Sequence, residues 1–166
     1  MSSTPKPHIR SLSREECESI LARNHVGRLA YSWNEHLDIE PLHYVFDGEW
    51  LYGRTSHGAK LTATGELWRP VAFEVDEVEG IFSWRSVVVH GGLYTVTDDG
   101  PEWRQEAWRT GVELLRSLIP ESFTSDDPMP ARSVMFRIAA QDLTGREATP
   151  SGGDPPASTS RSTETG

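Results

Sequence analysis

The sequence predicts a mainly β domain of the α+β class: a six-stranded antiparallel barrel, closed or split, with flanking helices. Six short segments are rich in strand-forming residues, and several of them alternate apolar residues with a period of two. A proline interrupts one segment and a glycine pair another, as expected where a small sheet bulges, bends and closes on itself. An open antiparallel sheet covered by helices is the alternative that the pattern leaves open.

The N-terminal part predicts a loose arm followed by one helix. Residues 1–10 are polar and carry two prolines, so they are expected to form a flexible arm. Ser13 and Glu16 have the spacing of a capping box, in which each side chain accepts a hydrogen bond from the backbone of the other residue. The helix that begins there is predicted to end near Arg23. Cys17 lies on its apolar stripe and is interpreted as a small core residue.

Three strands that pair in sequence are predicted next, at residues 26–33, 37–46 and 50–55. Asp47-Gly48 is a strong signal for a tight hairpin turn between the second and the third strand. Proline cannot donate a hydrogen bond to a neighbouring strand. Pro41 therefore predicts that the second strand lies at a sheet edge or bulges at that point.

The middle of the chain predicts a short helix over residues 58–68 and then a strand over 70–75, where apolar residues alternate with period two. The acidic segment 76–80 is interpreted as a turn. It leads into the longest strand-like run, 81–96. Gly91-Gly92 inside that run predicts a bulge or a sharp bend.

The last elements are a helix and a strand. Pro101 suits the first turn of a helix, because the missing N–H would have no partner there, and Pro120 ends the apolar pattern. Residues 121–130 are interpreted as a loop. Alternating apolar residues then predict a final strand over 133–139.

Length and composition predict one folded domain over residues 11–148 and a disordered tail over 149–166, which is mostly Ser, Thr, Gly and Pro. The formal net charge of -9 argues against general binding of nucleic acid or of anionic membranes. The chain carries one cysteine, so it has no intramolecular disulfide. It shows no bilayer-spanning apolar run and no signal-peptide pattern, so the cytoplasm is the expected location.

One stretch predicts a ligand site. At the end of the strand 50–55 the sequence brings together Arg54, Thr55 and Ser56, and Lys60 follows in the first turn of the predicted helix. A cation, two hydroxyls and the free N–H groups of a helix start can together hold a phosphate. The alternative is a solvated turn with one basic residue on each side.

Four segments in this order resemble the FMN-binding split-barrel superfamily, the pyridoxamine 5'-phosphate oxidase-like proteins, and within it the nitroimidazole-reductase-like branch. They are residues 12–30, 41–48, 52–61 and 84–91. The resemblance implies a homodimer with FMN in a groove at the subunit interface. The sequence lacks the second set of basic residues with which some relatives hold a substrate phosphate. The resemblance therefore does not imply oxidation of pyridoxamine phosphate.

The resemblance also assigns roles by position. The phosphate and ribityl end of FMN would be held by Arg54, Thr55, Ser56 and Lys60, and approached by Arg85 and Ser86. The isoalloxazine ring would lie along Leu42, His43, Tyr44 and Val87, with Trp84 nearby. The implied function is a flavin-dependent oxidoreductase that passes electrons from a reduced nicotinamide to a small acceptor, such as a nitro-aromatic or a quinone.

Three alternatives stay open. A deazaflavin could replace FMN in a reductase of the same fold. The protein could instead bind flavin or haem without turnover, with His43 or His57 as an axial ligand of haem. It could also be a dimeric structural domain with an empty groove. No metal site is predicted, because the spacing of the histidines fits no compact motif.

Overall fold

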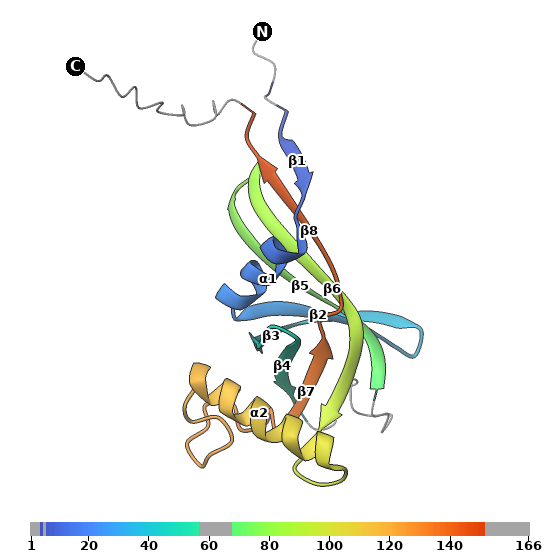
Figure 1. The fold of residues 1–166 in the computed structure, drawn as a ribbon, viewed down its shortest axis with the longest axis vertical. Helices are drawn as coiled ribbons and strands as arrows, with labels where there is room; N and C mark the ends of the chain where they lie inside the picture. Colours follow the sequence, from blue (N-terminus) through green and yellow to red (C-terminus); the bar gives the residue numbers. More distant parts are fainter. Residues whose placement is uncertain (1–3, 5, 57–67, 152–166) are drawn as a thin grey trace, which may run out of the picture.

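The computed structural model of the chain describes residues 4, 6–56 and 68–151. Within them two helices and eight strands follow one another (Figure 1), and their order and bounds are β1 (His8–Ser11), α1 (Arg14–Arg23), β2 (Val26–Trp33), β3 (His36–Phe46), β4 (Trp50–Thr55), β5 (Trp68–Gly80), β6 (Ser83–Val96), α2 (Glu102–Leu118), β7 (Val134–Ala139) and β8 (Asp142–Thr149).

Six of these strands close into an antiparallel barrel, which confirms the predicted fold class. The strand order is β6-β5-β2-β3-β4-β7, and β7 pairs with β6 to complete the circle. These six are the strands that the sequence predicts. The remaining two, β8 and β1, add to the free side of β6 and extend away from the barrel together with the β5–β6 hairpin (Figure 1).

The barrel closes because β6 changes neighbours along its length. Its first part pairs with β8 as far as His90, and its last part pairs with β7 from Leu93 onward. Gly91 lies at the change, where the backbone of β7 comes so close that a Cβ would sit 2.4 Å from the carbonyl oxygen of Ala139. Of the two predicted alternatives, a bulge or a sharp bend, the bulge is wrong, since the register with β5 continues unbroken through Gly91 and Gly92. The β5–β6 register shifts instead between Val78 and Gly80.

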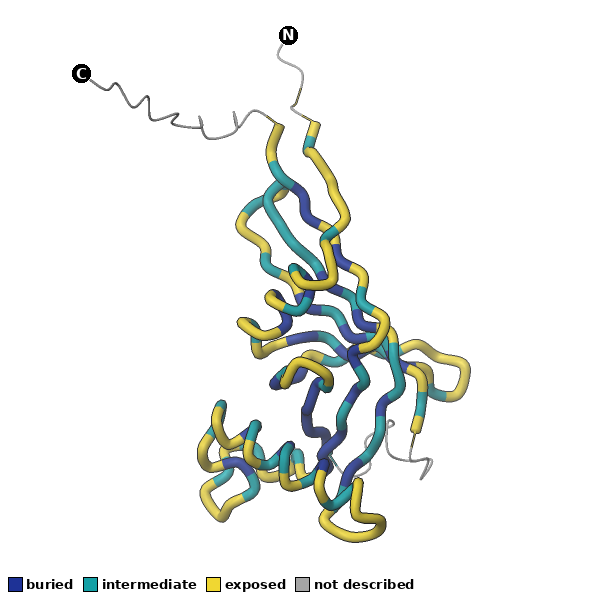
Figure 2. The backbone as a smooth tube through the Cα atoms, viewed as in Figure 1, coloured by how far each residue is buried: buried dark blue, intermediate teal, exposed yellow. Residues whose placement is uncertain are grey.

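The main core fills the barrel, and α1 packs into one mouth of it. Phe73, Leu29 and Val89 point inward and are at most 1% exposed. Ile20 and Leu21 of α1 join them. The predicted capping box begins this helix, with Glu16 N 3.2 Å from the Ser13 hydroxyl oxygen and Ser13 N 2.7 Å from the Glu16 carboxylate. Figure 2 shows the buried residues concentrated on the barrel strands.

A second apolar cluster lies outside the barrel, between α2 and the wall formed by β3, β4 and β7. Tyr52 and Met135 of the wall pack against Ala107 and Leu115 of α2. Gly111 lets the helix approach closely, because a Cβ there would meet the Met135 sulfur at 2.1 Å. This helix therefore covers one part of the barrel surface and leaves the β2–β5 part uncovered.

One interpretation of a turn is corrected. The acidic segment 76–80 continues β5 instead of turning, and two of its carboxylates, those of Asp76 and Glu77, are neutralised by arginines from neighbouring elements. Arg28 lies 2.5 Å from Asp76, and Arg23 lies 2.6 Å from Glu77. Arg23 and Arg28 lie far from this segment in the sequence, so the pattern of residues alone does not show that they pair with its carboxylates.

Other differences lie near the two ends of the domain. Residues His8–Ser11, part of the predicted arm, form β1 and pair with β8, which itself extends to Thr149. The predicted helix over 58–68 falls outside the described residues except for Trp68, which begins β5. Pro41 lies where β3 pairs only with β2, in agreement with the predicted edge position. Across the described residues no helix is long and apolar enough to cross a membrane.

Candidate functional site

The predicted phosphate cradle begins at the end of β4. Arg54 and Thr55 are its last two residues and are 4% and 3% exposed, and Ser56 follows them half-buried. Lys60 and His57 lie outside the described residues. Thr55 pairs with Val134 of β7, so the strand end is held in the barrel wall.

Arg54 points outward from the barrel, beneath the loop that joins α2 to β7. Its two terminal nitrogens donate to both carboxylate oxygens of Asp127, one of them at 2.9 Å, and its guanidinium lies 5.0 Å from the centre of the Phe123 ring. Asp127 also accepts from the backbone of Phe123 at 2.8 Å and of Met129 at 2.9 Å. The hydrogen bonds from Arg54 above all hold the pKa of Asp127 far below its usual range.

The described environment of Arg54 differs from the open cradle that the sequence predicts, and its role in holding a phosphate stays a prediction. Its guanidinium is buried and bound at two points by a carboxylate, so it presents no free positive charge to a phosphate. The sequence could not show this, because Asp127 lies 73 residues away along the chain. The parts of the cradle still open to a ligand are Ser56 at the strand end and the sequence-predicted Lys60.

Three residues that were expected along a flavin ring lie inside the barrel. Leu42, Tyr44 and Val87 are at most 2% exposed. The Tyr44 hydroxyl donates to the carbonyl oxygen of Leu21 at 2.8 Å, and burial raises the pKa of this phenol. Their side chains are core contacts, and only His43 of that set points to solvent.

The residues from Trp84 to Val87 alternate between the two faces of β6. Ser86 lies on the outer face and donates to Glu74 at 3.0 Å. Arg85 lies on the opposite face and donates to Glu147 at 2.5 Å. Neither residue meets the end of β4.

The residues predicted to hold the phosphate fall into two groups, one at the end of β4 and one around Ser86 of β6. These two groups lie at opposite ends of the barrel. Thr55 pairs with Val134, and the next residue of β7, Met135, pairs with Val96 at the end of β6. Ser86 lies ten residues earlier on β6, which is about 30 Å at the usual rise of a strand. One chain therefore cannot bring both groups to one phosphate.

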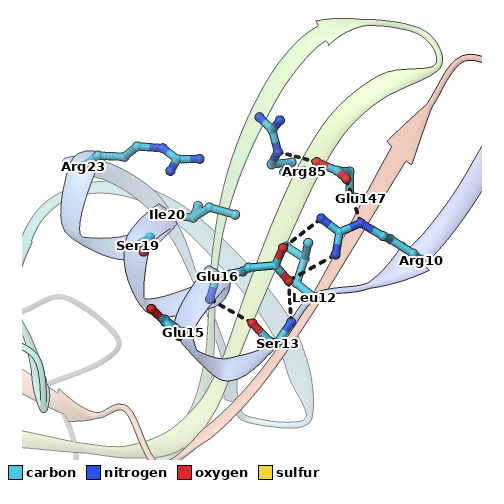
Figure 3. Close-up of a pocket in the computed structure, with 10 residues that line it drawn as sticks. All are labelled: Arg10, Leu12, Ser13, Glu15, Glu16, Ser19, Ile20, Arg23, Arg85 and Glu147. Atoms are coloured by element: carbon cyan, nitrogen blue, oxygen red, sulfur yellow. Dashed lines mark hydrogen bonds and ion pairs between the residues drawn. The ribbon is translucent and has the colours of Figure 1, made fainter. Parts of the chain in front are cut away.

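A cleft of about 420 Å³ lies between α1, β1 and β8. Figure 3 shows the side chains that line it. Glu147 accepts from Arg85 at 2.5 Å and from Arg10 at 2.9 Å, and Arg10 also donates to Glu16 at 2.8 Å. The hydrogen bond from Arg10 is the main cause that lowers the pKa of Glu16 to about 2. The sequence reasoning missed this network, because it took Arg10 for part of a loose arm.

The charges of this cleft neutralise one another. Arg23 binds Glu77 through both oxygens at 2.6 and 2.7 Å, so the third arginine of the lining is also engaged. Such a network fixes β1 and β8 to α1. It offers no excess of either charge to a ligand.

A broad outer face of the sheet carries exposed apolar side chains. On β3, Leu37 and Ile39 are 89% and 61% exposed, and on β2 Val26 is 50% exposed. The strand registers place Ile39 beside Ala30 of β2, and Ala30 beside Ala72 of β5. Neither helix contacts β2 in the described part of the chain. We call this β3–β2–β5 surface the open face.

The histidines that the structure describes do not gather with other metal ligands. His43 and His90 are exposed on different strands. Over the described ranges, no three His, Cys, Asp or Glu side chains lie close enough to hold a metal ion.

Comparison with known proteins identifies relatives. A family model described as pyridoxamine 5'-phosphate oxidase matches residues 13–147. An FAD-binding protein from Mesorhizobium loti is 29% identical, with a TM-score of 0.65, over 85% of this chain and 99% of that one. No curated protein matches the sequence.

Two further solved structures share the fold at lower identity. An FAD-binding protein from Mycobacterium smegmatis is 22% identical, with a TM-score of 0.55, over 84% of this chain and 97% of that one. A candidate 5-nitroimidazole antibiotic resistance protein from Bacteroides thetaiotaomicron is 15% identical, with a TM-score of 0.58, over 89% and 94%. These two likenesses concern the fold alone.

Proposed function

The chain belongs to the pyridoxamine 5'-phosphate oxidase family, and from this premise we propose that it binds a flavin, FMN in particular, between two copies of the chain. In this proposal it is an oxidoreductase that passes electrons from a reduced nicotinamide to a small acceptor, such as a nitro-aromatic or a quinone. The observation that carries the proposal is the match over residues 13–147, which spans the whole barrel, together with a 29% identical relative that binds FAD.

The open face supports the pairing of two copies. Leu37, Ile39 and Val26 are large apolar residues that stay exposed on this face in one copy, and exposed apolar surface of this kind marks interaction surfaces. A symmetric dimer through this face would also resolve the distance between the two predicted groups. The end of β4 in one copy could then face the Ser86 region of the other.

The residues present fit the phosphate end of a flavin in part. Ser56 offers a hydroxyl at the end of β4, and Lys60 is the sequence-predicted cation; Arg54 is engaged by Asp127 and acts on the site only by fixing the strand end. Of the ring-side candidates, His43 is exposed and Trp84 is half-buried. When bound, a flavin supplies the electron transfer itself, and the protein supplies binding and orientation.

The first experiment is an absorbance spectrum of the purified protein, with the released cofactor identified by mass spectrometry. A flavin spectrum with FMN released is expected. A Soret band would favour the haem alternative, and release of FAD would correct the choice of flavin. If FMN is present but NADPH or NADH does not bleach it, and no acceptor restores it, the oxidoreductase proposal fails and flavin binding alone remains.

The residue assignments need a separate test. We expect Lys60→Ala to weaken FMN binding at least tenfold while the melting temperature of the flavin-free protein stays the same. Ser86→Ala should weaken it less. If Lys60→Ala leaves FMN affinity unchanged, the phosphate is held elsewhere.

A further inference from the structure

A groove of about 330 Å³ lies on the barrel wall between α2 and the strands β4 and β7. It is separate from the end of β4 and from the open face. Two indole rings, Trp50 and Trp103, form its apolar sides, and Arg137 of β7 lies between them. The volume suits a single aromatic ring with a small substituent.

Arg137 is half-buried and lies against two indole rings. Its guanidinium lies 3.7 Å from the centre of the Trp50 ring and 5.6 Å from that of Trp103, which is a cation–π arrangement on both sides. Arg54 and Arg85 are bound by carboxylates, whereas Arg137 has no carboxylate partner among the described residues. Its Nε is buried and has no hydrogen-bond partner there.

A buried donor without a partner is costly, so an unpaired guanidinium nitrogen points to a missing acceptor. The Tyr52 hydroxyl interacts with the same guanidinium, but no described residue accepts a hydrogen bond from its Nε, so a ligand in the groove is one source of the missing acceptor. The Trp103 ring beside it is 43% exposed, although it is large and apolar. One site thus combines an unused donor with an uncovered aromatic face.

The remaining polar groups of the groove are the carboxylates of Asp47 and Glu106 and the hydroxyls of Tyr52 and Thr110. Asp47 belongs to the β3–β4 turn, where its carboxylate accepts from the backbone N–H groups of Glu49 at 2.8 Å and Trp50 at 2.7 Å. Glu106 stands exposed on α2. Two carboxylates beside one guanidinium disfavour a phosphate or another multivalent anion. They can accept hydrogen bonds from an N–H donor.

We propose that this groove binds a small planar aromatic amide. The amide oxygen accepts from Arg137, the amide N–H₂ donates to a carboxylate of the groove, and the ring packs on Trp103. An amide carries an acceptor and a donor side by side without net charge, which matches this set of groups. The proposal does not depend on flavin binding.

The test is a titration of the full-length protein, as purified, with benzamide, followed by tryptophan fluorescence and by saturation-transfer NMR. Benzamide is expected to bind in the millimolar range, and benzoate at least fivefold more weakly. Arg137→Gln should weaken benzamide binding at least tenfold. Arg109→Gln, an exposed arginine on α2 outside this groove, is the matched control and should leave binding unchanged.

A second variant tests the acidic side of the argument. Glu106→Gln removes one carboxylate and should narrow the preference for benzamide over benzoate. Arg137→Lys keeps the positive charge and serves as the conservative variant. The melting temperatures of all variants are compared, so that a loss of binding can be told apart from a loss of stability. The proposal is overturned if wild type binds no benzamide at concentrations 20-fold above the expected millimolar dissociation constant. It is also overturned if benzoate binds more tightly than benzamide, or if Arg137→Gln binds benzamide as well as Arg109→Gln does.

Discussion

Arg54 and Asp127 form a buried, two-point ion pair that joins the end of β4 to the loop between α2 and β7. Each side chain is at most 5% exposed. The sequence assigns Arg54 to a ligand, whereas in the structure its guanidinium is bound by Asp127 beside the candidate site.

Breaking this pair from one side should be more harmful than removing it. We expect Arg54→Ala to lower the free energy of unfolding by about 3–5 kcal/mol, because the Asp127 carboxylate stays buried without its partner. The double variant Arg54→Met, Asp127→Leu should lose clearly less. Urea denaturation of wild type, Arg54→Ala, Arg54→Met, Asp127→Leu and the double variant measures the differences. A double variant that loses the sum of the effects of Arg54→Met and Asp127→Leu would show that the pair has no coupling of its own.

Glu77 should make stability depend on acid pH. Hydrogen bonds from Arg23 above all lower its pKa from 4.5 to about 2 in the folded protein. The stabilisation is therefore complete above pH 4.5 and is lost as the pH falls toward 2. Thermal melts between pH 2 and 5 should show a shallower slope for Glu77→Gln than for wild type. Glu113→Gln, on the exposed side of α2, is the control and should keep the wild-type slope.

Gly91→Ala should weaken the closure of the barrel. An added Cβ would meet the Ala139 carbonyl oxygen at 2.4 Å, and that oxygen belongs to the backbone of β7, so it cannot move aside alone. We expect a loss of about 2 kcal/mol in the free energy of unfolding. Gly80→Ala, whose Cβ would have only Ser83 at 4.0 Å, is the matched control. Equal stabilities of the two variants would contradict the close approach of β7.

Tyr44→Phe separates a core role from a ligand role. The variant leaves the Leu21 carbonyl buried without its donor, so it should cost about 1–2 kcal/mol of stability. Because the ring lies inside the barrel, flavin affinity should not change. Chemical denaturation and an FMN titration measure the two effects independently. Weaker FMN binding at unchanged stability would restore Tyr44 to the site.

The fold could be predicted well from the sequence, because strand signals are local. Alternation of apolar residues and the Asp47-Gly48 turn gave the six barrel strands, and Ser13 with Glu16 gave the first helix. The short β1 was missed, since a four-residue strand with exposed side chains has no pattern of its own. The strand β1 is held in place by its pairing with β8, which lies far along the chain.

The surroundings of the predicted site residues could not be predicted from the sequence, because they depend on contacts between distant residues. The motif around Arg54 shows a cation at a strand end, but nothing nearby in the sequence shows that Asp127 neutralises it. Likewise, the alternation of Leu42, His43 and Tyr44 predicts that neighbours face opposite ways, yet not which of them faces the core. Family resemblance assigns positions and leaves such side-chain environments open.

The pairing of His8 with Thr149 sets the first and the last strand of the domain side by side. The strands β1 and β8 pair antiparallel like the two strands of a hairpin, but no turn joins them. A short Gly-Ser linker between these residues would supply that turn, and new termini could be opened in the exposed Asp47-Gly48 turn. The barrel should tolerate this circular permutation, because its registers depend on which strands are neighbours and not on the order in which the chain visits them.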